Sequence, residues 1–331
     1  MTRFSLPIVA AVIAIPVITA PVLASDSVEI REWEVPYEYT RPRDPDTADG
    51  NSIWFVGQGG DYLARFDVSM EAFHKIDLEP GVGPHNLIVD ADGAVWFAGN
   101  RKGYIEHCDS ESGEIEKISI PITAARDPHT LVFDKAGDIW FTVQGGNYIG
   151  KLSVLDRRVD LVEVPTRRAR PYGIVVSPDG TPWIALFGIN KLSSVDPETL
   201  ALTEHVLPRN DARPRRLVVT SDGRVWYVDY AGGFLGVFDP TTGSYSEWLL
   251  PSGEDASPYA MAVDSQDRIW LVETGSSPNL FVGFDPIRER FFSVTPLPSG
   301  GGTVRHMTYD RSTGTIWFGA DTNTIGRAMV E

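Results

Sequence analysis

The sequence has a single cysteine, Cys108, among its 331 residues. One thiol excludes internal disulfides, and it cannot supply a cysteine-rich zinc site or an iron–sulfur cluster. Positive charge is also scarce, since 29 Lys and Arg side chains face 45 Asp and Glu, for a formal charge of −16. Binding to nucleic acid or to an anionic membrane requires a basic surface, so we expect neither as a partner. Helical periodicity of useful length is missing as well, which argues against a helical fold.

Residues 1–24 have the features of a secretory signal peptide. Arg3 precedes a long apolar run, and small residues form a cleavage site after Ala24. An uncleaved membrane anchor is the alternative, but two prolines interrupt the run, which is short for a membrane span. The sequence therefore predicts an exported protein, periplasmic or secreted, with no membrane attachment after cleavage and with residues 25–331 as one domain.

Most of the chain is an internal repeat marked by tryptophan. Seven tryptophans recur at spacings of 42, 44, 43, 43, 44 and 47 residues. They are Trp54, Trp96, Trp140, Trp183, Trp226, Trp270 and Trp317. Each repeat contains a short apolar strand, a turn such as Asp92-Gly93, a second strand with the tryptophan, and two further strands. Four short strands in about 43 residues are typical of a β-propeller blade. The sequence predicts an all-β, seven-bladed β-propeller whose tryptophans anchor the blade cores.

The N-terminal strand is expected to complete the last blade. Residues 29–36 resemble the fourth-strand pattern of residues 246–251, whereas the last repeat ends after its third strand, near Ala328. Pairing of these two segments would close the ring and leave no open sheet edge between the first and last blades. The aspartates in the turns lack the spacing of an EF-hand calcium loop, so they predict hairpin turns instead.

A polar position lies eleven residues before each tryptophan, and we call it the slot. In a propeller this position begins the innermost strand of the blade, so the seven slots should ring one mouth of the central channel. The slot residues are Arg43, His85, His129, Tyr172, Arg215, Tyr259 and His306. Further arginines flank several slots, which predicts a positive mouth that binds an anionic or strongly polar small molecule. The alternative is that these arginines pair with neighbouring acids such as Asp44 and Asp229.

The repeat resembles that of the virginiamycin B (streptogramin B) lyase family. Its best copy runs from Asp127-Pro128-His129 through Trp140 to the segment Asn147-Tyr148-Ile149-Gly150-Lys151-Leu152. The resemblance implies a seven-bladed propeller that opens a cyclic lactone by elimination. It also implies a Mg²⁺ ion held by two glutamates at the channel mouth, with a histidine acting as general base or acid.

Carried onto this chain, the resemblance makes His129 the catalytic residue, with His85 in the preceding blade. Asp127 stands at the position of the first glutamate and is a shorter oxygen ligand. Val143 stands at the position of the second and cannot bind a hard cation, which leaves the neighbouring Gln144 as the remaining candidate metal ligand. The candidate substrate-binding residues are Arg43, His85, Tyr172, Arg215, Tyr259, Glu273 and His306.

The sequence leaves three functions open for a protein expected to be a monomer. The first is a carbon–oxygen lyase that acts on an ester or lactone. The second is a non-catalytic propeller that binds an anionic ligand or a protein partner. The third, a propeller-type sugar-lactone hydrolase, needs a carboxylate-rich metal centre that these residues do not assemble.

Overall fold

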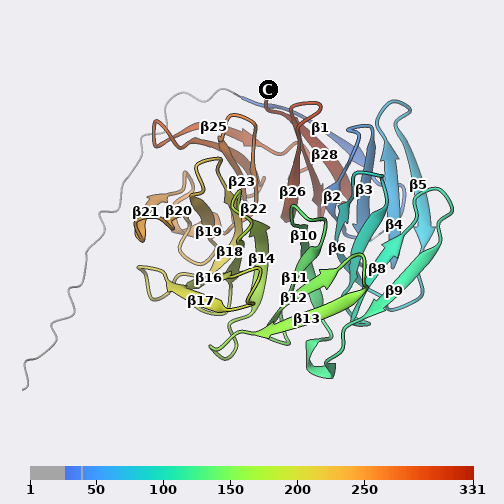
Figure 1. Ribbon diagram of the computed structural model, residues 1–331. Coiled ribbons are helices and arrows are strands. Elements are labelled where there is room, and N and C mark those ends of the chain that lie inside the picture. The colour runs from blue at the N-terminus through green and yellow to red at the C-terminus, as the bar shows by residue number, and fades with distance from the viewer. Residues whose placement is uncertain (1–26, 39) are drawn as a thin grey trace, which may run out of the picture.

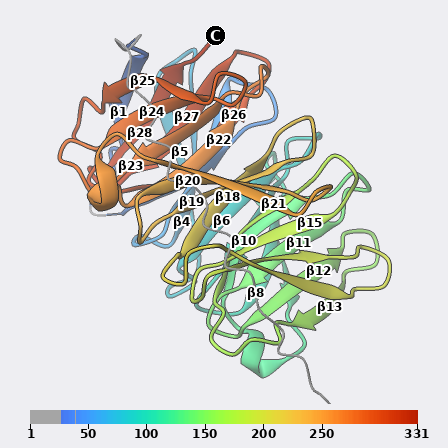
Figure 2. The same ribbon diagram turned by 90° about the vertical axis from the view of Figure 1, so that its left-hand side faces the viewer.

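The computed structural model describes residues 27–38 and 40–331, which form seven four-stranded antiparallel sheets. The sheets are arranged as blades around a central channel (Figure 1 and Figure 2). This arrangement confirms the all-β, seven-bladed propeller. The predicted signal peptide, residues 1–24, lies outside the described residues.

Six blades are built from four consecutive strands, with the first strand innermost and the fourth outermost. Blades 1 to 3 contain β2 (Pro42–Asp46), β3 (Ser52–Gly57), β4 (Tyr62–Asp67) and β5 (Ala72–Asp77); β6 (Pro84–Val89), β7 (Val95–Gly99), β8 (Tyr104–Cys108) and β9 (Ile115–Ser119); and β10 (Pro128–Phe133), β11 (Ile139–Val143), β12 (Tyr148–Ser153) and β13 (Arg158–Glu163). Blades 4 to 6 contain β14 (Pro171–Val176), β15 (Pro182–Leu186), β16 (Lys191–Val195) and β17 (Leu202–Val206); β18 (Pro214–Val219), β19 (Val225–Asp229), β20 (Phe234–Asp239) and β21 (Ser244–Leu249); and β22 (Pro258–Val263), β23 (Ile269–Glu273), β24 (Leu280–Asp285) and β25 (Arg290–Pro296).

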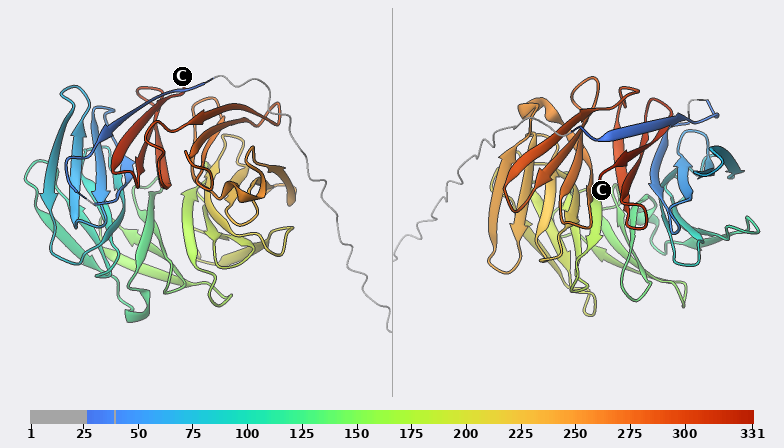
Figure 3. Two further views of the ribbon diagram at one scale, coloured as in Figure 1. Left: turned by 180° about the vertical axis from the view of Figure 1, so that it is seen from behind. Right: turned by 90° about the horizontal axis from the view of Figure 1, so that it is seen from above.

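Blade 7 joins the two ends of the described chain. It contains β26 (Val304–Asp310), β27 (Thr315–Ala320), β28 (Thr324–Met329) and, as its outermost strand, β1 (Glu29–Glu34). β1 pairs antiparallel with β28 along its whole length, and Figure 3 shows the two strands side by side. Trp33 of β1 stacks on Trp317, with 5.7 Å between ring centres. The predicted closure of the ring is therefore confirmed.

The repeat tryptophans are core residues, as predicted, and none is more than 5% exposed. In blades 2, 3 and 6 an aspartate of the hairpin turn accepts a hydrogen bond from the indole N–H of the repeat tryptophan. Trp96 donates its indole N–H to one oxygen of Asp90 (3.1 Å), and the other oxygen accepts the backbone N–H groups of Asp92 and Ala94. One carboxylate thus holds the hairpin turn and satisfies the buried indole. Cys108 is also fully buried.

A glycine recurs in the third strand of the repeat because an aromatic ring lies over it. A Cβ atom on Gly150 would lie 2.1 Å from the ring of Phe141. The same crowding occurs between Gly326 and Phe318. Gly150, in the segment that resembles the family repeat, is therefore required by the packing of the blade.

A β-bulge in the innermost strand of each blade shapes the channel. In blade 2, Pro84 lies opposite Gly99 and Leu87 lies opposite Phe97. The innermost strand therefore advances three residues where its neighbour advances two. The same shift occurs in the other six blades. The described helices are two short 3₁₀ turns, η1 (Thr123–Ala125) and η2 (Gly253–Ala256), and neither is long or apolar enough to cross a membrane.

Candidate functional site

The bulged strands line the channel in successive rings, each with one residue per blade. In each blade, one residue of the innermost strand pairs with the third residue past the tryptophan, and the residue directly after it belongs to the first ring. The first-ring residues are Arg43, His85, His129, Tyr172, Arg215, Tyr259 and Arg305. The second ring holds the next residues: Asp44, Asn86, Thr130, Gly173, Arg216, Ala260 and His306. The third ring contains the strand partners of the tryptophans: Asp46, Ile88, Val132, Val175, Val218, Ala262 and Thr308.

The structure corrects the slot of blade 7. In the other blades the strand partner of the tryptophan lies eight residues before it, whereas Thr308 lies nine residues before Trp317. The hairpin turn of blade 7 is one residue longer, so counting back from the tryptophan gives the wrong residue. Arg305 occupies the first ring, and His306, the predicted slot residue, belongs to the second ring.

The first ring brings together six of the predicted site residues. The imidazole rings of His85 and His129 lie 3.7 Å apart between centres, and His129 lies 4.1 Å from the ring of Tyr172. The hydroxyl groups of Tyr172 and Tyr259 form a hydrogen bond. All four residues are buried, with His85 the most exposed at 6%. The first ring thus fills much of the channel with side chains in mutual contact instead of lining a wide mouth.

Two arginines at this end of the channel keep unused hydrogen-bond donors. The guanidinium carbon of Arg215 lies 3.6 Å from the ring centre of Tyr259 and 4.2 Å from that of Tyr230. Its Nε is buried without a hydrogen-bond partner, and it forms no ion pair with a carboxylate of the described chain. Arg43 donates from Nη1 to Gln58 (2.9 Å), but its Nη2 is buried and unpartnered. Both sets of donors suit an oxyanion or a carbonyl oxygen.

The second ring forms a polar network across the channel. Asp44 accepts hydrogen bonds from Arg43 (3.0 Å) and from Arg216 (3.4 Å). Arg216 also donates to Thr130 (3.0 Å) and to the carbonyl oxygen of Arg305 (3.1 Å), so one side chain connects blades 1, 3, 5 and 7. The predicted pairing of arginines with acids is therefore present for Arg43 and Arg216, and Arg41 and Arg305 likewise pair with Asp321. Arg215 has no carboxylate partner in the described chain.

The hydrogen bonds fix the tautomer of one of the two stacked histidines. Nδ1 of His85 lies 3.0 Å from the carbonyl oxygen of His129, and because a carbonyl only accepts, this Nδ1 carries the hydrogen. Nδ1 of His129 lies 2.8 Å from the Thr130 hydroxyl, which also accepts from Arg216 and can either donate to this nitrogen or accept from it. His85 therefore has its lone pair on Nε2.

Burial and nearby arginines keep both histidines neutral. Burial lowers the pKa of His85 and of His129 well below the usual value, and the charges of Arg43 and Arg216 lower it further. Burial opposes ionisation of Tyr172, but the arginines of the two rings outweigh it, so the pKa of Tyr172 lies below its ordinary value. Three groups that can exchange a proton thus lie in contact inside a positive site.

The carboxylate of Asp127, a predicted metal ligand, is hydrogen-bonded to the backbone of a loop. Its carboxylate accepts the backbone N–H groups of Gly145 and Gly146, the latter at 2.9 Å. It makes no hydrogen bond to His129 in the described chain, since Thr130 holds Nδ1 of that residue. In the described chain Asp127 therefore holds a loop and does not orient the imidazole of His129.

Gln144, the other predicted metal ligand, and the neighbouring candidate residues do not complete a metal site. Val143 is fully buried in β11 opposite Pro128, and Gln144 beside it is half-buried. Glu273 is fully buried and accepts hydrogen bonds from the backbone and hydroxyl groups of Ser252. Like Asp127, it therefore holds a loop in place. Within residues 27–38 and 40–331, no three His, Cys, Asp or Glu side chains gather where they could hold a metal. These donors do not fit Mg²⁺, which prefers several oxygen ligands in octahedral geometry.

The second ring was not predicted from the sequence as a site. Asp44, Asn86, Thr130 and Arg216 each directly follow a slot. The adjacent pair Arg215-Arg216 is the signal that could have pointed to this layer, because two successive channel-facing residues require a bulge.

Comparisons with known proteins agree with this architecture. A model of the virginiamycin B lyase family matches residues 24–195, just over half of the chain. A streptogramin B lyase structure is 23% identical, with a TM-score of 0.82, and the match covers 92% of this chain and 98% of that one. Virginiamycin B lyase from Staphylococcus aureus is 21% identical, with a TM-score of 0.83 and coverage of 92% and 100%. YCF48 bound to D1 peptide is 13% identical, with a TM-score of 0.73 and coverage of 95% and 98%. A comparison with curated protein sequences gives no match.

Proposed function

Because this chain belongs to the virginiamycin B lyase family, we propose that its first-ring end binds a small anionic or carbonyl-rich molecule and opens an ester or lactone bond in it by elimination. The observation that carries the proposal is the surplus of buried positive charge. Two buried guanidinium groups, those of Arg43 and Arg216, share the single carboxylate of Asp44 beside two neutral imidazoles, and the guanidinium of Arg215 has no carboxylate partner in the described chain. Such a site attracts negative charge and stabilises the charge that develops as a proton leaves carbon.

Each chemical role in the elimination has a candidate side chain. The unused N–H groups of Arg215 and Arg43 would hold the carbonyl oxygen that acidifies the neighbouring C–H bond. Nε2 of His85 would accept that proton, and the C–H electron pair would form the C=C bond as the adjacent C–O bond breaks. The ester oxygen would leave as a carboxylate, with the imidazole N–H of His129 as its hydrogen-bond donor. The sequence-based assignment of His129 to proton transfer thus becomes a role shared with His85.

The proposal includes no step through Mg²⁺. The family resemblance implies that ion, but the carboxylates of Asp127 and Glu273 are already used by loop backbone and by Ser252. Guanidinium groups would supply the electrostatic stabilisation instead.

The decisive assay uses a streptogramin B-type lactone with the purified protein, with and without Mg²⁺, and follows the product by mass spectrometry. Elimination gives a ring-opened product of unchanged mass that contains a dehydrated residue. His129→Ala and His85→Ala should abolish turnover, whereas His74→Ala should not, because His74 is exposed on β5. A product heavier by one water would identify a hydrolase and overturn the elimination.

A second candidate function, binding without catalysis, is favoured by the burial of the first ring. A bound molecule would meet mainly the half-buried side chains around it, such as Gln58, Asn100, Phe187 and Tyr230. The similar propeller of YCF48 is described as bound to a peptide. Lactone or peptide binding that depends on Arg215, without turnover, would support this function and reject the lyase.

We also propose that the protein acts outside the cytoplasm, on the sequence of residues 1–24 alone. N-terminal sequencing of protein recovered from the periplasm or medium should then begin near Ser25. Recovery only in the membrane fraction, with Thr2 retained, would favour the anchor instead.

A further inference from the structure

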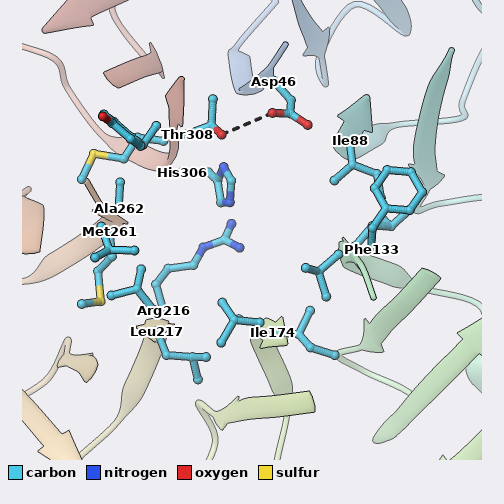
Figure 4. A pocket seen from close by; sticks show the side chains of 18 of the residues that line it. Asp46, Ile88, Phe133, Ile174, Arg216, Leu217, Met261, Ala262, His306 and Thr308 are labelled. Atoms are coloured by element: carbon cyan, nitrogen blue, oxygen red, sulfur yellow. Dashed lines mark hydrogen bonds between the residues drawn. The ribbon is translucent and has the colours of Figure 1, made fainter. Parts of the chain in front are cut away.

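A cavity occupies the third-ring end of the channel. Its volume is about 440 Å³, within the range of small-molecule sites. The inner strands of all seven blades contribute to it, and Figure 4 shows its mainly apolar walls. The wall residues used below are Ile88, Ile174, Leu217 and Met261.

Two second-ring side chains form the inner end of this cavity. In Figure 4, Arg216 and His306 point toward each other between the apolar walls. Nδ1 of His306 is buried and has no hydrogen-bond partner among the described residues. Arg216 uses one N–H on each of its three nitrogens for the network, which leaves two N–H groups free. The inner end of the cavity thus offers donors that no protein acceptor uses.

The acidic groups around the cavity restrict where an anion can lie. Asp44, the carboxylate next to Arg216, also serves Arg43 and so does not neutralise the second ring. Asp46 lies on the wall, and its oxygens accept from the Val89 backbone (2.9 Å) and from the Thr308 hydroxyl (3.2 Å). Negative charge is therefore favoured at the inner end and disfavoured at the level of the wall.

We propose that this cavity binds a monocarboxylate with an apolar chain. The carboxylate would accept hydrogen bonds from Arg216 and His306, and the chain would lie against Ile88, Ile174, Leu217 and Met261. This site shares Arg216 with the proposed lyase site but lies on the other side of the second-ring network.

Isothermal titration of the purified protein with decanoate tests the proposal without reference to lactone turnover. Decanol has the same chain without the charge, and acetate has the charge without the chain. Decanoate should bind one per protein and about tenfold more tightly than either probe, because a charge-assisted hydrogen bond and apolar burial both contribute. Equal binding of decanol and decanoate would overturn the assignment of the charged end.

Two substitutions locate the binding site. His306→Leu removes the unpartnered donor, and Ile88→Trp narrows the cavity, so each should weaken decanoate binding about tenfold. The matched controls are His74→Leu and Ile287→Trp, at exposed positions, and these should bind as the wild type does.

A measurement on the wild type keeps the test independent of how the variants fold. The imidazole NMR signals of His306 should shift with decanoate and stay unchanged with decanol. An unshifted His306 during saturable decanoate binding, or wild-type affinity in both cavity variants, would place the ligand elsewhere and overturn the proposal.

Discussion

Asp44 and Asp46 lie two residues apart on β2, yet they sit in opposite environments of the channel. Burial disfavours the charged form of Asp44, but Arg43 and other neighbours outweigh it, so its pKa lies well below the usual range. Burial raises the pKa of Asp46 to about 6, despite hydrogen bonds from Val89 and Thr308. The same side chain on one strand is thus stabilised as an anion in the second ring and destabilised in the third.

This difference separates the two ends of the channel by chemistry. At the first-ring end, arginines, histidines and tyrosines contact one another and can hold charge. At the third-ring end, mainly apolar side chains surround the channel, and Asp46, Thr308 and Arg311 are polar members of the wall. A polar reaction suits the first end, and an apolar chain suits the second.

The largest predicted effect concerns catalysis at the first-ring end. His129→Ala should lower lactone turnover by roughly 10²–10⁴-fold, the usual range for a group that transfers a proton. Ile88→Ala, at the third-ring end, should change it less than about threefold. Turnover is measured as loss of lactone at saturating substrate, with thermal unfolding as the control for folding. Equal losses in both variants would contradict a division of function between the ends.

Loss of the anion in the second ring should cost the most stability. Asp44→Ala leaves Arg43 and Arg216 buried without a carboxylate, so we expect a loss of about 3–5 kcal/mol in the free energy of unfolding. Asp44→Asn keeps one hydrogen-bond acceptor and should lose less. Urea unfolding measures both, and a loss below about 1 kcal/mol for Asp44→Ala would show that the arginines do not depend on this carboxylate.

The blade architecture could be predicted because each tryptophan is buried at the same place on the second strand of its repeat. The first ring followed from the repeat as well, except in blade 7, where a longer turn moved His306 by one position. The second ring was not predicted, because a bulge adds a channel-facing residue whose one sequence mark is the adjacent pair Arg215-Arg216. Asp127 lies where the family resemblance implies a metal ligand, but a carboxylate at such a position can also hold a loop, as Glu273 does in blade 6.

The raised pKa of Asp46 predicts a pH effect of opposite sign to that of a paired aspartate. Its pKa is raised from 3.8 to about 6, so its contribution to stability is present below pH 3.8 and is lost as the pH rises through 6. Between about pH 4.5 and pH 7.5 the loss should be roughly 2 kcal/mol. Asp46→Asn should remove this pH-dependent loss. The free energy of unfolding of the variant should therefore increase relative to that of the wild type as the pH rises. A stability difference that is constant with pH would contradict the charge penalty.

Ligand binding at the first-ring end should depend on salt. Arg215→Gln keeps a polar side chain but removes the cation that has no carboxylate partner. We expect about tenfold weaker binding of an anionic ligand at low salt and a smaller difference at high salt, because screening reduces the attraction. Decanoate binding at the third-ring end should be affected less. A loss of affinity that does not change with salt would assign Arg215 a packing role among its aromatic neighbours.

The smallest predicted effect concerns the hydrogen bond between Thr308 and Asp46 at the third-ring end. Thr308→Val keeps the shape of the side chain but removes the hydroxyl that donates to Asp46 (3.2 Å). At about pH 7.5 Asp46 is ionised, so losing this donor should cost about 1 kcal/mol. Near pH 4.5 the carboxyl is protonated and needs the donor less, so the cost should shrink. Urea unfolding at both pH values measures the difference, and the double variant with Asp46→Asn removes the titrating group. If Thr308→Val costs the same at both pH values, and in the Asp46→Asn background as well, the hydroxyl acts through packing. The Thr308 hydroxyl would then not stabilise the charged form of Asp46 at the third-ring end.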